Sequence, residues 1–122
     1  MIFKKTQQIS SVEEMTLTIR GMRGGRVYRL EGGELCRYRE KSSGDLELEV
    51  KAACDLVSLM NTCGVLRWDG FHGKHPRGVL DGDMFDFRAD VNGGVSIRAN
   101  GSANFPKGYR ELVRAFDEIL RE

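Results

Sequence analysis

The sequence lacks the features that mark membrane proteins and secreted proteins. It contains no apolar run close to the roughly 20 residues that a membrane-spanning helix needs. Its first segment, 1–14, carries two lysines but no apolar stretch behind them, which a secretory signal would require. We therefore expect a cytoplasmic protein that has no membrane partner.

An excess of charge of one sign is also lacking, since 19 Lys and Arg residues stand against 18 Asp and Glu residues and the net charge is +1. A balanced chain gives no global reason to expect binding to nucleic acid or to a membrane surface. One stretch, 20–41, is locally basic, with seven basic residues against three acidic ones. These basic residues are dispersed, as on an arginine-bearing strand face, so no nucleic-acid partner is expected.

Cysteine is scarce: there are three residues, Cys36, Cys54 and Cys63, and none has the C-x-x-C spacing of a zinc or redox site. An odd number without a signal peptide indicates free thiols in a reducing compartment. Cys54 and Cys63 are expected to share a helix, about 13 Å apart along its axis, which is too far for a disulfide. We therefore expect free thiols, most of them buried.

Catalytic and cofactor-binding signatures are missing as well. There is no G-x-S-x-G nucleophile motif, and the stretch "GMRGGR" lacks the lysine and the hydroxyl of a phosphate-binding loop. The two histidines of "HGKHP" match no standard metal motif, so we expect no metal site and no cofactor. The remaining candidates for acid–base groups are the loop residues His72, His75 and Asp81.

The apolar pattern predicts a single α+β domain over residues 15–122, preceded by a loose arm or edge strand over 1–14. Alternation predicts an antiparallel meander and a later hairpin, and helical spacing predicts two amphipathic helices packed on one face of the sheet. The meander strands are expected near 15–22, 26–31, 34–40 and 45–51, the hairpin near 84–100, and the helices near 52–63 and 106–121. The expected core contains Leu17, Ile19, Leu48, Leu56, Met60, Phe85, Phe87, Ile97, Leu112 and Phe116.

The register of the hairpin follows from which side chains must be buried. A two-residue turn would pair Asp90 with Val95 and would mix polar and apolar residues on each face. A three-residue loop, 92–94, pairs Val91 with Val95 and leaves one face wholly apolar. We therefore predict the longer loop, closed by a glycine in the left-handed region.

The segment 64–83 lacks periodicity and is long for a connection inside a compact domain. It holds the only tryptophan, Trp68, together with Phe71 and both histidines. We predict that Trp68 and Phe71 pack against the sheet or the last helix and so hold the segment in place. The alternative is that these two aromatic side chains anchor a partner protein.

The junction 99–106 combines glycine, serine, asparagine and proline immediately before the last helix. Ser102 or Asn104 can accept a hydrogen bond from the first turn, and the pattern leaves open whether Asn104 or Phe105 is the cap. A helix N-terminus also attracts anions, and Lys107 adds a positive charge there. Ser102, Asn104 and Lys107 therefore form a candidate anion site in addition to the capping role.

Residues 64–120 contain four features in a fixed order: a W-x-G-F stretch, a loop ending in L-D-G, a hairpin with an aromatic strand, and an aromatic-Pro-x-x-aromatic start of the last helix. In this order they resemble a family of small uncharacterised bacterial domains. The family has no assigned activity, so the resemblance implies a fold and no mechanism. The motif residues in this chain are Trp68, Gly70, Phe71, Leu80, Asp81, Gly82, Gly101, Asn104, Phe105, Pro106 and Tyr109.

Two functions fit these observations. The first, which we expect, is a non-catalytic binding or interaction module with a protein partner or a second copy of itself. The second is a small enzyme that uses His72, His75 and Asp81 of the 64–83 segment as acid–base groups. An enzyme needs these side chains to converge in one concavity, whereas a module places Trp68 and Phe71 in the core or on a flat apolar patch.

Overall fold

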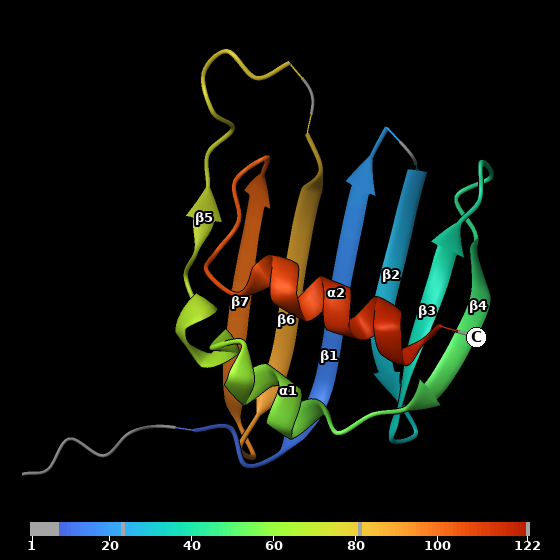
Figure 1. The fold of residues 1–122 in the computed structure, drawn as a ribbon, viewed down its shortest axis with the longest axis vertical. Helices are drawn as coiled ribbons and strands as arrows, with labels where there is room; N and C mark the ends of the chain where they lie inside the picture. Colours follow the sequence, from blue (N-terminus) through green and yellow to red (C-terminus); the bar gives the residue numbers. More distant parts are fainter. Residues whose placement is uncertain (1–7, 23, 81, 122) are drawn as a thin grey trace, which may run out of the picture.

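A seven-stranded sheet carries two helices on one of its faces (Figure 1). The computed structural model describes residues 8–22, 24–80 and 82–121. The α+β class predicted from the sequence is confirmed. In chain order the elements are β1 (Val12–Gly21), β2 (Gly24–Glu31), β3 (Glu34–Glu40), β4 (Leu46–Ala53), α1 (Leu56–Thr62), the 3₁₀ helix η1 (Val65–Trp68), β5 (His72–Gly73), β6 (Met84–Val91), β7 (Val95–Ser102) and α2 (Tyr109–Ile119).

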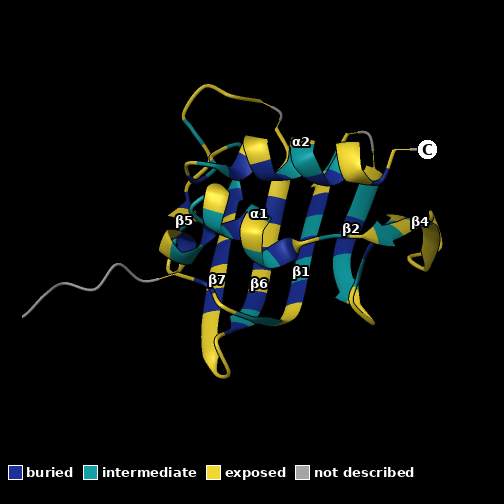
Figure 2. Ribbon diagram, turned by 60° about the horizontal axis from the view of Figure 1, so that its bottom comes forward, coloured by how far each residue is buried: buried dark blue, intermediate teal, exposed yellow. Residues whose placement is uncertain are grey.

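The strand order is β4-β3-β2-β1-β6-β7-β5, which puts β1 and β6 side by side in the middle of the sheet. Neighbouring strands pair antiparallel except for β5 and β7, which are parallel. Buried and exposed residues alternate along β6 and β7, and both helices lie on the side that the buried residues face (Figure 2). No described helix covers the other side, which we call the open face.

Glycines set the geometry of two hairpin connections. β2 and β3 are joined at Gly32 and Gly33, whose φ angles of 57° and 82° are those that a two-residue hairpin turn requires. β6 and β7 pair in the register Val91–Val95, the register that the apolar alternation predicts. Gly93 in their loop has a φ of 73°, a value that is unstrained only for glycine and a few polar residues.

The chain joins the fold before the predicted boundary at residue 15. β1 begins at Val12 and lies between β2 and β6, not at an edge. Ile9 is buried, and its backbone N–H and C=O both bond to the side-chain amide of Asn61 in α1, at 2.9 and 2.8 Å. Of the predicted arm, residues 1–7 lie outside the described residues.

The predicted core residues are buried with one exception. Leu48 in β4 is 46% exposed, so its assignment to the core is wrong. The β3–β4 register shifts between Arg37 and Tyr38, and this bulge places Leu48 opposite Tyr38. Because Arg37 faces α2, where it pairs with Asp117, Tyr38 and Leu48 lie on the open face.

Helix α1 begins at Leu56, not near residue 52 as predicted. β4 continues through Ala53, and the Asp55 side chain then caps the helix by accepting a hydrogen bond from the N–H of Ser58 at 3.1 Å. Cys54 therefore precedes the helix, and the prediction that it shares this helix with Cys63 is wrong. All three cysteines are free, and burial raises the pKa of each thiol.

Helix α2 begins at Tyr109, and neither predicted cap is used. Its N-cap is Gly108, which has a φ of 93° and offers no side chain. Asn104 donates from its amide to the carbonyl of Lys74 at 3.1 Å, and Phe105 stacks on Tyr109 with ring centroids 4.5 Å apart. The predicted start near residue 106 and the two candidate caps are wrong, because the left-handed residue at 108 interrupts the helical path. Across the described ranges, no helix is both long enough and apolar enough to span a membrane.

Aromatic residues tie the segment 64–83 to the core, as predicted. Trp68 is 2% exposed, and its ring packs edge-on against Phe87 at 5.0 Å between ring centroids. Its indole N–H donates to the carbonyl of Lys107 at 2.9 Å, which links the segment to the start of α2. Phe71 packs against Phe85 at 6.3 Å. Trp68 is therefore a core residue and does not present its ring to a partner.

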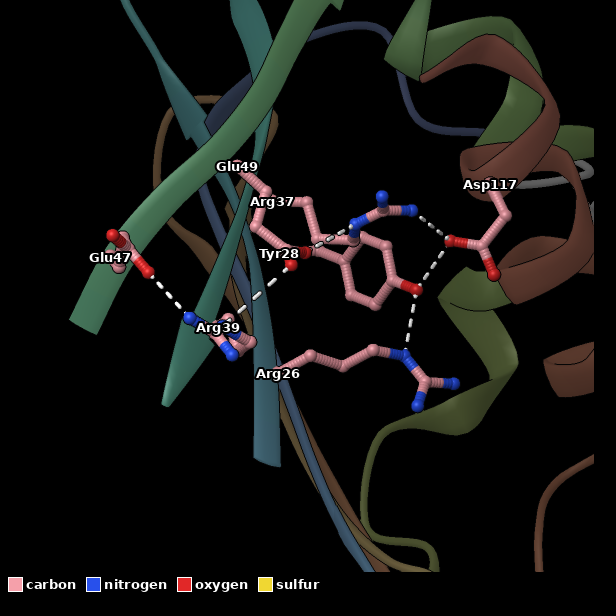
Figure 3. A network of polar contacts seen from close by, with 7 residues as sticks. All are labelled: Arg26, Tyr28, Arg37, Arg39, Glu47, Glu49 and Asp117. Atoms are coloured by element: carbon pink, nitrogen blue, oxygen red, sulfur yellow. Dashed lines mark hydrogen bonds and ion pairs between the residues drawn. The ribbon is translucent and has the colours of Figure 1, made fainter. Parts of the chain in front are cut away.

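A polar network joins the sheet to α2 (Figure 3). The Tyr28 hydroxyl donates to a carboxylate oxygen of Asp117 at 2.6 Å and accepts from Arg26 Nε at 3.0 Å. Arg37 donates to the same Asp117 oxygen at 3.0 Å and to Glu49 at 3.1 Å. The buried Tyr28 hydroxyl is thus satisfied on both sides, as a group out of contact with water must be.

Stability is expected to fall in alkali because of Tyr28. Burial and the hydrogen bond to Asp117 raise the pKa of Tyr28 to about 12 from its ordinary value of 10.0. Above about pH 10 the unfolded chain releases this proton while the folded protein keeps it, so the free energy of unfolding decreases with pH. The decrease amounts to roughly 2–3 kcal/mol by pH 12. Urea unfolding between pH 9 and 12 measures it, and Tyr28→Phe should show a shallower decline; equal slopes would contradict the assignment.

Candidate functional site

A cleft of about 490 Å³ opens on the open face, between β1, β5, β6 and β7. Two rows of paired residues cross its floor, and strand alternation points their side chains away from the helices. We call it the open-face cleft. One row consists of Thr18, Asp86, Asn100 and His72, each paired directly with the next. The neighbouring row consists of Arg20, Met84 and Ser102.

Two histidines form one wall of the open-face cleft. His72 Nδ1 bonds to the Asn100 side-chain oxygen, which can only accept, so this nitrogen donates. His75 Nε2 bonds to the carbonyl of Val79 and therefore carries a proton. In the singly protonated ring, His75 Nδ1 then accepts from the Ser102 hydroxyl at 2.8 Å. Both imidazoles are held in fixed orientations by these partners.

Charges of both signs border the open-face cleft. Arg20 donates through two nitrogens to the carboxylate of Glu40, at 3.1 and 3.3 Å, and this pairing raises the pKa of the guanidinium. Lys74 lies on the histidine wall, and the carboxylate of Asp86 lies on the floor. The cleft can therefore bind a ligand that both donates and accepts hydrogen bonds, including one that carries both charges.

The floor of the cleft is backed by the junction that precedes α2. A Cβ atom at Gly101 or at Gly73 would lie 2.2 or 2.4 Å from the carbonyl oxygen of Asn104, so only glycine allows this close approach. The amide of Asn104 holds the Lys74 carbonyl from the same side. The junction "ANGSANFP" thus holds the segment 72–75, which contains both histidines, against β7. This is a structural role for the junction.

The structure brings together some of the residues predicted from the sequence and separates others. His72, His75 and Ser102 all border the open-face cleft. Asn104 and Lys107, two residues of the candidate anion site, border a different hollow beside Gly108, whereas Ser102, the third, borders the open-face cleft. Asp81, the third acid–base candidate, lies outside the described residues.

Sequence reasoning missed Thr18, Arg20, Asp86 and Asn100 as members of one site. Alternation showed that each lies on a polar strand face, but nothing in the sequence indicated that β1 pairs with β6. Among the residues that the structure describes, no group of three His, Cys, Asp or Glu side chains is arranged to hold a metal ion.

Comparison of the chain with protein-family models, with curated proteins and with solved structures finds no match. The resemblance to a family of small bacterial domains therefore stays a prediction.

Proposed function

We propose that the protein is a non-catalytic interaction module that binds a short polar segment of a protein partner in the open-face cleft. One observation carries the proposal: polar side chains from four strands converge in one hollow on the sheet face that no described helix covers. A cleft of about 490 Å³ falls within the size range of ligand sites, roughly 300–1,000 Å³.

The chemistry of the cleft favours a peptide as its ligand. A peptide backbone presents donors and acceptors in alternation, and the floor offers both through Thr18, Asn100 and Ser102. Lys74 suits an acidic group and Asp86 a basic one. Strands hold all of these side chains except Lys74, and hold them more rigidly than loops would, so little ordering is needed on binding. The resemblance and the free thiols favour a bacterial, cytoplasmic setting for this module.

Two serines on β7 allow a matched test of the proposed site. Ser102 borders the cleft, whereas Ser96 bonds to Asp90 elsewhere on the strand. With free tripeptides as probes, we expect Ser102→Ala to weaken the best binder roughly fivefold, the value of one hydrogen bond. Ser96→Ala should leave its affinity unchanged. The proposal fails if no tripeptide binds saturably, or if both variants bind as the wild type does.

The bond between Ser102 and His75 favours the alternative, a small enzyme of the hydrolytic kind. A serine hydroxyl that donates to an imidazole, itself oriented by the Val79 carbonyl, is a nucleophile beside a base. Attack of Ser102 Oγ on an ester carbonyl would transfer the hydroxyl proton to His75 Nδ1, which would pass it to the departing alkoxide so that the alcohol leaves. The acyl group left on Ser102 would then be released as a carboxylate by water, with His75 again as the base. His72 and Asp81 would be the further acid–base groups of this alternative.

Hydrolysis of p-nitrophenyl acetate separates the two functions. An enzyme should lose at least about a hundredfold in rate when His75 or Ser102 is replaced, because general-base assistance is removed. If the protein is an interaction module, neither His75 nor Ser102 should raise the rate of hydrolysis above the rate in buffer. A saturable rate that disappears in both Ser102→Ala and His75→Gln would favour the enzyme.

A further inference from the structure

A second cleft lies beside α2, on the helix-covered face of the sheet. Its volume is about 720 Å³, and it is bounded by the side of α2, by Arg26 of β2, and by residues around Asp83 and Phe105. Arg26 and Tyr28 point toward α2, so this cleft is on the opposite face from the open-face cleft. We call it the α2 cleft.

Arg26 is the most unusual group in the α2 cleft. Among the described arginines of β1, β2 and β3, it alone forms no salt bridge with a carboxylate. Asp117 across the cleft is already bonded to Tyr28 and Arg37. Among the described residues, Arg26 donates a hydrogen bond only through its Nε, to Tyr28, and its two terminal nitrogens turn away from this network (Figure 3). A half-buried guanidinium with two such nitrogens matches the geometry of a carboxylate or phosphate.

Helix α2 and the residue that follows its C-cap add three guanidinium groups along the same cleft. Arg110 and Arg114 share one side of α2, because a spacing of four residues is close to a whole turn, and Arg121, just after the helix, lines the same cleft. Asp117, which is one turn from Arg121, bonds to Arg37 instead. None of these three arginines forms a salt bridge within the described ranges. Asp83, Asp117 and Glu118 also line the cleft, so its four guanidinium groups exceed its carboxylates by one, and the guanidinium of Arg26 forms no salt bridge with any of them in the described part of the chain.

The inner wall of the α2 cleft is apolar and aromatic. Phe105 stacks on Tyr109 with an angle of 12° between the rings, and the Arg110 guanidinium lies 5.8 Å from the Phe105 centroid. Val113 continues this wall along the helix. A flat apolar body can pack there while an attached anion reaches Arg26.

We propose that the α2 cleft binds a small organic anion, a carboxylate or a phosphate attached to a ring-sized apolar body, with Arg26 as its main partner. The site does not depend on the open-face cleft, because the two lie on opposite faces and have no lining residue in common. The volume of about 720 Å³ is within the range of small-molecule sites.

Calorimetric titration with phenyl phosphate and with benzoate tests this proposal. Inorganic phosphate lacks the ring and phenol lacks the anion, so both should bind at least tenfold more weakly than the better probe. Arg26→Gln should weaken that probe about ten- to a hundredfold, as expected for hydrogen bonds to a charged group. Arg67→Gln removes the same charge from an exposed position outside both clefts and should have no effect.

A second variant serves as a control in case Arg26→Gln fails to fold. Arg114 is exposed on α2, so Arg114→Gln keeps the fold and should still weaken binding severalfold. Preference for phenyl phosphate over benzoate would identify the ligand class as a phosphate, and the reverse preference as a carboxylate. The proposal is overturned if neither probe binds saturably, if phenol binds as well as the anions, or if Arg26→Gln and Arg67→Gln bind alike.

Discussion

Replacing Trp68 by alanine is expected to lower the free energy of unfolding by about 3–5 kcal/mol, as for other buried large-to-small changes. Trp68 is 2% exposed and packs against Phe87 from the sheet and, at 6.1 Å between ring centroids, against Tyr109 from α2. Its removal leaves a cavity between the 64–83 segment, the sheet and the last helix, and it also leaves the carbonyl of Lys107 without its donor. Urea unfolding followed by circular dichroism measures the loss.

A conservative change at the same position separates packing from hydrogen bonding. Trp68→Phe keeps an aromatic ring but removes the indole N–H that bonds to Lys107. We expect it to cost less than the alanine variant, about 1–3 kcal/mol for the smaller ring and the unsatisfied carbonyl. If Trp68→Ala cost less than about 1 kcal/mol, the ring would not be the core residue described above.

Gly108→Ala is expected to destabilise the protein by about 2–5 kcal/mol, for two separable reasons. The residue has a φ of 93°, which costs alanine about 1–2 kcal/mol. A Cβ atom there would also lie 2.0 Å from the carbonyl oxygen of Cys63, at the end of α1. Relieving that overlap requires α1 and α2 to move apart, which adds about 1–3 kcal/mol.

Gly24→Ala is the matched control for Gly108→Ala. Gly24 has a φ of 97°, nearly the same as Gly108, but apart from its neighbours along the chain no atom of the described residues lies within 4 Å of the Cβ that alanine would add. The free energy of unfolding of this variant should therefore fall only by the cost of the left-handed backbone conformation, about 1–2 kcal/mol. Equal losses in the two variants would mean that the contact between the ends of α1 and α2 contributes nothing.

Local patterns in the sequence predicted much of this fold. Alternation located the meander strands and the hairpin, because each strand has one face against the helices and one against solvent. The burial argument also predicted the Val91–Val95 register. Leu48 was misassigned because a single bulge in the β3–β4 pairing places Leu48 and Val50 on opposite faces of the sheet. A bulge cannot be recognised from the alternation of apolar residues in the sequence.

Long-range pairing explains why only part of the candidate site could be predicted. His72, His75 and Ser102 were identified individually, by residue type and by their position next to turns. Their assembly depends on the pairing of β5 with β7, and the pairing of β1 with β6 adds Thr18 and Arg20 to the same site. The start of α2 was missed because the sequence places several capping residues before it, and tertiary contact with Cys63 selects Gly108 instead.

The most direct test of the account is to locate where peptides bind, by amide chemical-shift mapping of the labelled protein with the tripeptide probes. We predict saturable shifts that cluster at four residues of the two rows on the floor of the open-face cleft, Thr18, Asp86, Asn100 and Ser102. These shifts should weaken in Ser102→Ala but not in Ser96→Ala. Shifts confined to α2 and its flanks, or no saturable shift with any tripeptide, would contradict the assignment of the open-face cleft as the binding site.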